Sequence, residues 1–331
     1  MNYKLSLLIL FISIFSHSTN ITFLTDNEQS YFLNYNNIKI INRMFSPKDL
    51  SKEIPTFYGI YRIGADLVQK TIKNKTHNNK FVLGVIDGNF DIEKNFIKNK
   101  IQNSLPFCEI IEKRKDETQE HGTHVVGTIC GENYGVAYNC NFSLCLALGN
   151  GYVFKDDSCH NKYFKSILSY YQKNNVKIVS RSMGSKKILR SFDEEDTIKQ
   201  IIKFTNKTNA IFVNAAGNDN AQIFDIDEGS LEQNNVLVVS NIDFLNFKNE
   251  SSNFGDLIFI AAPGTNIFSS TTKKNEQNYE SIHYDNSKDN GEKRLIKLTG
   301  TSMATPHVSG TIAAMIDVNR SEEHTSELQS H

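Results

Sequence analysis

Residues 81–87 read FVLGVID, an apolar run that ends in a carboxylate. Comparable apolar runs recur along the chain at residues 142–148, 176–183, 210–216, 236–240 and 257–261. Between some of these runs, residues 163–172 and 194–205 have the apolar spacing of helices. Strands that are apolar on both faces and alternate with helices indicate an α/β fold, with a mostly parallel central sheet and helices on both faces.

The composition is that of a folded, nearly neutral protein. The 331 residues include 36 basic and 37 acidic side chains, which gives a formal net charge of −1. Apolar residues make up 39% and charged residues 22%, which excludes a disordered polyelectrolyte, a collagen and a protein with many membrane spans. Because there is no basic excess to neutralise phosphates, we expect no nucleic-acid partner.

The N-terminus predicts a secretory signal peptide over residues 1–18. Lys4 precedes the apolar run 5–15, and Ser16 and Ser18 are small residues suited to cleavage. An apolar run of this length is too short to cross ~30 Å of hydrocarbon as a helix, so we expect no stable membrane insertion. Sequons for N-glycosylation agree with a secreted protein and occur at Asn20, Asn74, Asn141, Asn206 and Asn249.

The C-terminal residues 320–331 read RSEEHTSELQSH, a string that resembles the translation of a sequencing adapter. We interpret this string as an artefact and exclude it from the fold. We therefore expect the natural protein to continue beyond Asn319, with the C-terminal part of its fold truncated here.

The chain has five cysteines, and this odd number leaves their state open. A free thiol, an intermolecular bridge and a partner cysteine in a lost segment are all compatible with it. Their spacing matches no zinc pattern. They are Cys108, Cys130, Cys140, Cys145 and Cys159.

Four short segments place reactive residue types at strand ends and helix starts, where chemistry sits in such sheets. They are Asp87, HGTH at 121–124, Gly217-Asn218, and GTSMATPH at 300–307. Each alone has a plain structural explanation, such as a helix cap, core histidines or a turn. A nucleotide-binding domain is disfavoured because the chain has neither GxGxxG nor a Walker motif.

Together, in the order Asp, His, Asn, Ser, these segments resemble the subtilisin-like serine proteases, and within them the proteinase-K-like members. The resemblance runs from about Pro55 to Asn319. Further matching motifs are YGVA at 134–137, SMG at 182–184, SNFG at 252–255 and APG at 262–264. The resemblance implies a short pro-segment or N-terminal extension over residues 19–50 and an incomplete catalytic domain over residues 51–319.

The resemblance implies a secreted serine endopeptidase that acts on polypeptides and is a monomer. Asp87, His121 and Ser302 would form the catalytic triad, and Asn218 would donate to the oxyanion. His124 would be a packing residue. The alternative is a catalytically impaired pseudoprotease that keeps the fold and acts as a binding protein.

Substrate recognition and metal binding are likewise implied by the resemblance. The substrate would lie extended beside Ser182, Met183 and Gly184 and pair with them through the backbone. The chemistry requires no cofactor. A structural calcium ion is a family feature, and Asp243 is its candidate ligand.

The chain departs from the family pattern in three places. Asp87 is followed by Gly88 and Asn89, so a hydroxyl that the family has at position 88 is missing, and we expect weakened positioning of the carboxylate at most. The segment 19–50 is shorter than the usual inhibitory pro-domain. The helix expected at 302–316 would lose its cover through truncation and leave the chain poorly stable.

One internal segment looks like an insertion. Residues 271–294 are rich in lysine and asparagine and have no apolar periodicity. We expect a surface loop there.

Overall fold

The computed structural model describes residues 57–66, 69, 81–88, 90–92, 94–104, 110–113, 120–138, 140, 142–148, 152–154, 157–183, 192–223, 235–271, 281–283 and 294–329. Residues 56–331 form one compact unit. The predicted signal peptide and pro-segment lie outside the described residues.

Within the described residues, the largest sheet has seven strands in the order β2-β4-β1-β6-β7-β8-β9. Every neighbouring pair in this sheet is parallel. The predicted parallel sheet is therefore confirmed. The strands are β1 Phe81–Asp87, β2 Ile101–Ser104, β4 Phe142–Leu148, β6 Val176–Arg181, β7 Ile211–Ala215, β8 Val236–Ile242 and β9 Ile260–Pro263.

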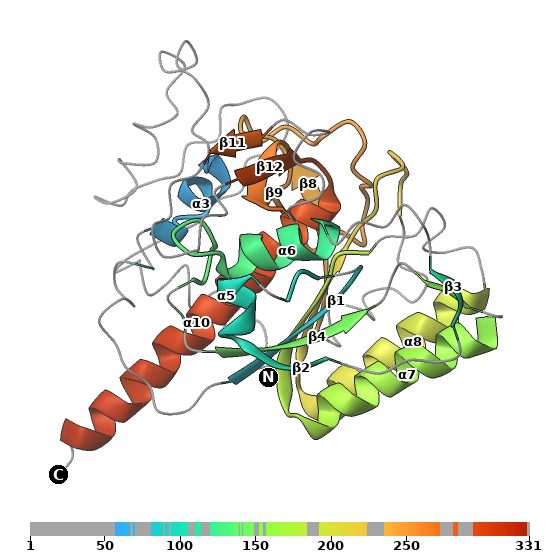
Figure 1. Cartoon of the computed structure of the whole chain (residues 1–331), viewed down its shortest axis with the longest axis horizontal. Coiled ribbons are helices and arrows are strands. Elements are labelled where there is room, and N and C mark those ends of the chain that lie inside the picture. The colour runs from blue at the N-terminus through green and yellow to red at the C-terminus, as the bar shows by residue number, and fades with distance from the viewer. Residues whose placement is uncertain are drawn as a thin grey trace. The chain divides into compact units, whose positions relative to one another are not determined.

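Helices cover both faces of this sheet, as predicted (Figure 1). On one face, Val179 of β6 and Phe212 of β7 lie in a buried cluster with side chains of α7 and α8. On the opposite face, Ser180, the next residue after Val179, meets Ser309 of α10 at an Oγ–Oγ distance of 2.9 Å. The helices are α3 Tyr58–Arg62, α5 Asn95–Lys98, α6 Glu120–Cys130, α7 Asp157–Lys173, α8 Phe192–Thr208 and α10 Thr301–Gln329.

Tyr171 of α7 ties that helix to the middle of the sheet. Its side chain is fully buried, and its hydroxyl lies 3.0 Å from the carbonyl oxygens of Val85 in β1 and Cys145 in β4. The ring fits because position 84 is a glycine: a Cβ there would lie 2.6 Å from Cε2 of Tyr171. The helix can approach β1 this closely only without a side chain at position 84.

The prediction of a surface loop over residues 271–294 was wrong for part of that segment. Strand β11 (Ser281–His283) lies within it and pairs antiparallel with β12 (Arg294–Leu298). β12 also pairs with β10 (Ile267–Ser270), which gives a small antiparallel sheet. A second small sheet joins β3 (Ile110–Lys113) to β5 (Tyr152–Phe154). Strands this short carry too few side chains to show a period of two in the sequence.

The prediction that the helix after residue 301 lies partly uncovered was also wrong for the described side chains. Residues 301–317 are buried, except that Thr311 and Ile316 are half-buried. Helix α10 packs against α6 and against the strands β6, β7, β8 and β9. In Figure 1, α10 is the long helix that runs past α6.

Three cysteines of the described part are free and buried, namely Cys130, Cys140 and Cys145. Burial raises the pKa of Cys130 and of Cys145 to about 12. These thiols are therefore packing groups and poor nucleophiles.

No helix in the described part of the chain is both long and apolar enough to cross a bilayer.

The packing of Tyr171 against position 84 can be tested by substitution. We expect Gly84→Ala to destabilise the protein by about 1–3 kcal/mol, because the new methyl group overpacks a buried site. Gly88→Ala is the matched control, since a Cβ at Gly88 meets nothing within 4 Å. Urea unfolding of both variants measures the difference in their free energy of unfolding. Equal midpoints would contradict the close packing of Tyr171 against position 84.

Candidate active site

Three neighbouring strands bring the predicted site residues to one edge of the sheet. Asp87 is the last residue of β1, Ser182 follows β6, and Asn218 lies three residues beyond the end of β7. Since β1, β6 and β7 are adjacent and parallel, their carboxyl ends meet. Helices α6 and α10 then begin at the same edge and supply His121 and Ser302.

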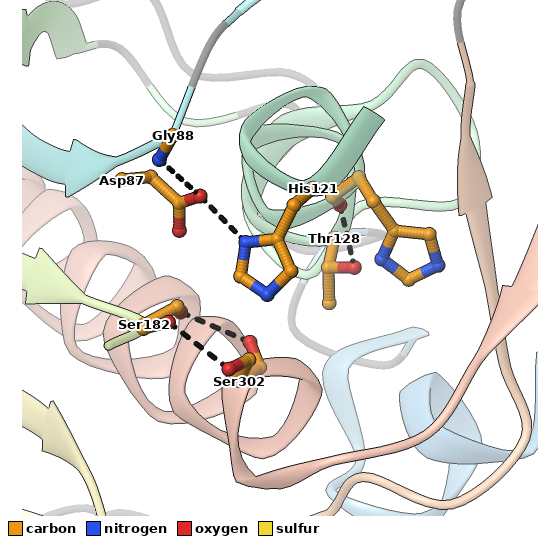
Figure 2. Close-up of polar contacts among 7 residues, drawn as sticks. Asp87, Gly88, His121, Thr128, Ser182 and Ser302 are labelled. Carbon is orange, nitrogen blue, oxygen red and sulfur yellow. Dashed lines mark hydrogen bonds and ion pairs between the residues drawn. The ribbon is translucent and has the colours of Figure 1, made fainter. Parts of the chain in front are cut away.

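The carboxylate of Asp87 contacts the imidazole of His121. Nδ1 of His121 lies 2.6 Å from Oδ1 of Asp87. The aspartate side chain is fully buried, whereas 44% of the histidine side chain is exposed. Figure 2 shows the His121 ring between Asp87 and Ser302, with one nitrogen directed at the carboxylate. This arrangement fixes the ring through Nδ1.

The two oxygens of Asp87 differ in their hydrogen bonds. Oδ1 accepts a hydrogen bond from the Gly88 N–H at 2.7 Å in addition to the contact with His121. Oδ2 is buried and has no hydrogen-bond partner among the described residues. Among the described residues, the carboxylate is therefore held through one oxygen, Oδ1.

Ser302 and Ser182 exchange two hydrogen bonds. The Ser302 hydroxyl donates to the Ser182 carbonyl at 3.0 Å, and the Ser182 hydroxyl donates to the Ser302 carbonyl at 2.9 Å (Figure 2). Ser302 is the second residue of α10, so its N–H is one of the donors that a helix leaves without an internal acceptor. A hydroxyl and a free N–H therefore lie together at the start of this helix.

Asn218 is oriented by Thr301, a residue to which the sequence analysis assigned no role. The Thr301 N–H donates to Oδ1 of Asn218 at 2.9 Å, and the Thr301 hydroxyl lies 3.2 Å from the same oxygen. Because an N–H can only donate, the atom that faces it must be the amide oxygen. The NH₂ group of Asn218 is thus left as a donor on an exposed residue.

The structure describes two of the three predicted substrate-binding residues. Ser182 and Met183 follow β6, while Gly184 lies outside the described residues. The Met183 carbonyl accepts a hydrogen bond from Arg181 at 3.4 Å, and the same guanidinium donates to Asn214 of β7 at 2.8 Å. Arg181 therefore links the segment after β6 to the strand that leads to Asn218.

Asp243 lies apart from these residues, in the turn after β8. Its Oδ1 accepts the N–H groups of Leu245 at 2.8 Å and Phe247 at 2.9 Å, as a turn-capping carboxylate does. Within the described residues, no three histidine, cysteine, aspartate or glutamate side chains gather in a group that could hold a metal ion. The described side chains thus explain Asp243 as a cap, and calcium binding there stays a prediction.

His124 and His307 are buried behind the site. Nε2 of His124 contacts the Ile267 carbonyl at 2.9 Å, and Nδ1 of His307 contacts the Met303 carbonyl at 2.8 Å. Burial lowers the pKa of His124 to about 3 and that of His307 to about 4. Both are neutral packing residues in the folded protein, as predicted for His124.

These two histidines predict a loss of stability in acid. Below pH 6.5 the unfolded chain protonates both rings, while the folded chain leaves them neutral until about pH 4. The free energy of unfolding should therefore fall as the pH is lowered from about 6.5 to about 4. Thermal unfolding of a Ser302→Ala protein measures it without self-cleavage. In that background, His307→Gln should make the free energy of unfolding depend less on pH. An unchanged pH dependence would contradict the role of His307 in the acid instability.

Comparison with known proteins agrees with the sequence motifs and the fold. The family model described as the subtilase family matches residues 78–330. The major intracellular serine protease of Bacillus subtilis (strain 168) is 28% identical over 245 residues, which are 70% of this chain and 66% of the relative. The alkaline proteinase of Hapsidospora chrysogena is 29% identical over 204 residues, which are 59% of this chain and 42% of the relative.

A similar solved structure is that of the prenylagaramide maturation protease, with a TM-score of 0.54 and 21% identity over 76% of this chain and 79% of that one. At this identity the likeness supports the fold. The chain spans about two thirds of the bacterial relative and about two fifths of the fungal one.

Proposed function

Because the chain belongs to the subtilase family, we propose that it is a serine endopeptidase that cleaves peptide bonds through an acyl-enzyme intermediate. The observation that carries this proposal is the contact between Asp87 and His121 at 2.6 Å beside the hydroxyl of Ser302. A serine hydroxyl is a weak nucleophile by itself and needs a neighbouring base.

In this proposal His121 is the general base. Ser302 first turns its hydroxyl hydrogen from the Ser182 carbonyl toward Nε2 of His121. His121 takes that proton as the Ser302 oxygen attacks the scissile carbonyl carbon, and then gives the proton to the leaving amine. Water then attacks the acyl group by the same route and frees the serine.

Asp87 has two roles in the proposed mechanism. Its contact with Nδ1 keeps the proton of neutral His121 on that nitrogen, so that Nε2 can accept. Its negative charge, buried and without a solvent shell, stabilises the imidazolium that forms during attack. Both roles are compatible with a carboxylate held through one oxygen.

Two donors are proposed to bind the oxyanion of the tetrahedral intermediate. One is the NH₂ group of Asn218, which the contact of Oδ1 with Thr301 leaves directed away from Thr301. The other is the Ser302 N–H, at the positive end of the dipole of α10. Donors fixed before the reaction stabilise the developing charge without reorganisation.

The substrate proposed is an extended polypeptide that pairs with the backbone of the segment after β6. Ser182 and Met183 directly follow this strand in the chain, and Gly184 is the third residue proposed for this pairing. Backbone pairing is independent of side-chain identity, which suits the cleavage of varied peptide sequences.

We also propose that the protein is secreted. The basic residue and apolar run at the N-terminus and the sequons support this proposal. One relative carries the word intracellular in its name, so the family alone does not decide the compartment.

A fluorophosphonate probe tests the proposed function against the pseudoprotease alternative. The probe reacts with an activated serine, so it should label the wild-type chain and fail to label Ser302→Ala and His121→Ala. Gly88→Ala is the matched control that should remain labelled, since it changes the same site without removing a reacting group. A folded wild-type chain that takes up no label would overturn the protease proposal.

The oxyanion role of Asn218 predicts a specific kinetic defect. We expect Asn218→Ala to lower kcat by about 10²–10³, or roughly 2.7–4 kcal/mol, a range taken from an oxyanion donor of a subtilisin. KM should change little, because the donor acts on charge that exists only in the transition state. Steady-state hydrolysis of a peptide substrate measures both constants. A rise in KM with kcat unchanged would contradict this role.

A further inference from the structure

The loop that carries Asn218 rests on a second loop that comes from a distant part of the chain. Residues 216–221 follow β7, and residues 249–254 follow β8. Asn253 lies at the centre of the contact, and only 2% of its surface is exposed. Asn253 belongs to the SNFG motif at residues 252–255.

Asn253 holds the peptide groups on both sides of Asn218. Its backbone N–H donates to the carbonyl of Gly217 at 3.0 Å. Its side-chain oxygen accepts the N–H of Asp219 at 3.0 Å. These two bonds fix the planes of the peptide units that precede and follow Asn218, and with them the direction in which its side chain leaves the backbone.

Two further bonds from the same side chain extend this hold along the loop. Oδ1 of Asn253 also accepts the N–H of Ala221 at 3.0 Å, and Nδ2 donates to the carbonyl of Ala216 at 2.8 Å. The amide therefore uses its oxygen twice and its nitrogen once. In a buried site such bonds face little competition from water, so they restrict the loop strongly.

Further hydrogen bonds join the loop of residues 249–254 to the loop of residues 216–221. The Asn220 N–H donates to the Ser251 carbonyl at 2.8 Å. The ammonium of Lys248 donates to Oδ1 of Asn220 at 3.0 Å and to the Ser252 carbonyl at 3.1 Å. The loop that carries Asn253 is thus itself held in place by hydrogen bonds.

We propose that Asn253 is a positioning residue of the oxyanion site, which it serves by orienting Asn218. This inference rests on the proposed function. Thr301, at the start of α10, holds the side-chain oxygen of Asn218. Asn253 holds the peptide groups before and after Asn218. The NH₂ group keeps its direction only when both act.

Hydrogen exchange tests the hold of Asn253 on the loop without any need for activity. In a Ser302→Ala background, Asn253→Ala should speed exchange of the Asp219 and Ala221 amides by about tenfold or more, because their acceptor is gone. Asn253→Asp keeps an oxygen acceptor and should restore much of the protection. Unchanged exchange in Asn253→Ala would overturn the inference.

Ser252→Ala is the matched control in the same loop. Ser252 is fully buried; its hydroxyl accepts the Asn241 N–H at 2.9 Å and donates to the Asn253 carbonyl at 3.1 Å, so its loss disturbs the same loop but leaves the Asn253 side-chain amide that holds Asp219 and Ala221. This variant should lose stability while leaving exchange at Asp219 and Ala221, and also kcat, as in the wild type. A drop in kcat equal to that of Asn253→Ala would show a general loop effect and overturn the proposed role.

A kinetic cycle tests whether Asn253 acts through Asn218. Asn253→Ala should lower kcat by about 10- to 100-fold with KM nearly constant, because a displaced group loses its contact with the transition state. In an Asn218→Ala background the same change should cost less than about twofold, since the group it positions is absent. Equal losses in both backgrounds would overturn the inference.

The two proposals fail in distinguishable ways. If the wild-type chain were inactive while exchange in Asn253→Ala rose as expected, the protease proposal would fall and the hold of Asn253 on the loop would be supported. If the wild type were active and the cycle additive, the protease proposal would stand and the positioning role would fall.

Discussion

The hydrogen bond from the Ser182 hydroxyl to the Ser302 carbonyl holds the start of α10 against the end of β6, and the rest of the site depends on it. The two residues are 120 positions apart in the chain, so this bond joins its middle to its C-terminal part. With Ser302 held there, Thr301 lies beside Asn218 and reaches its side-chain oxygen. The β6 end, the start of α10 and the loop after β7 thus form one assembly.

Helix α10 can be buried although many of its residues are polar, because its hydroxyl groups bond within the helix. Thr305 donates to the Thr301 carbonyl at 2.9 Å, and Ser309 donates to the Thr305 carbonyl at 3.1 Å. Side chains satisfied in this way need no water. The expectation of an uncovered helix was wrong because α6 and the strands β6, β7, β8 and β9 pack against it.

The sequence predicted the parts of the fold and site whose signals are contiguous. β1 and β4 have the predicted bounds because each is a continuous apolar run. β9 begins three residues later than predicted, at Ile260, and ends at Pro263. The residues proposed for catalysis lie in short motifs. The bonds of Asn253 go mainly to backbone groups. Because nearly every residue has the same backbone groups, the sequence does not show which of them Asn253 contacts.

Position 217 is closed to substitution for two unrelated reasons. Gly217 has a φ of +99°, which side chains of L-residues rarely adopt, and a Cβ there would lie 2.5 Å from Nδ2 of Asn253. If the backbone at position 217 changed to a common φ, a new side chain would still collide with Asn253. If Asn253 were removed, the backbone at position 217 would still be strained. No single compensating substitution would therefore make another residue tolerable at position 217.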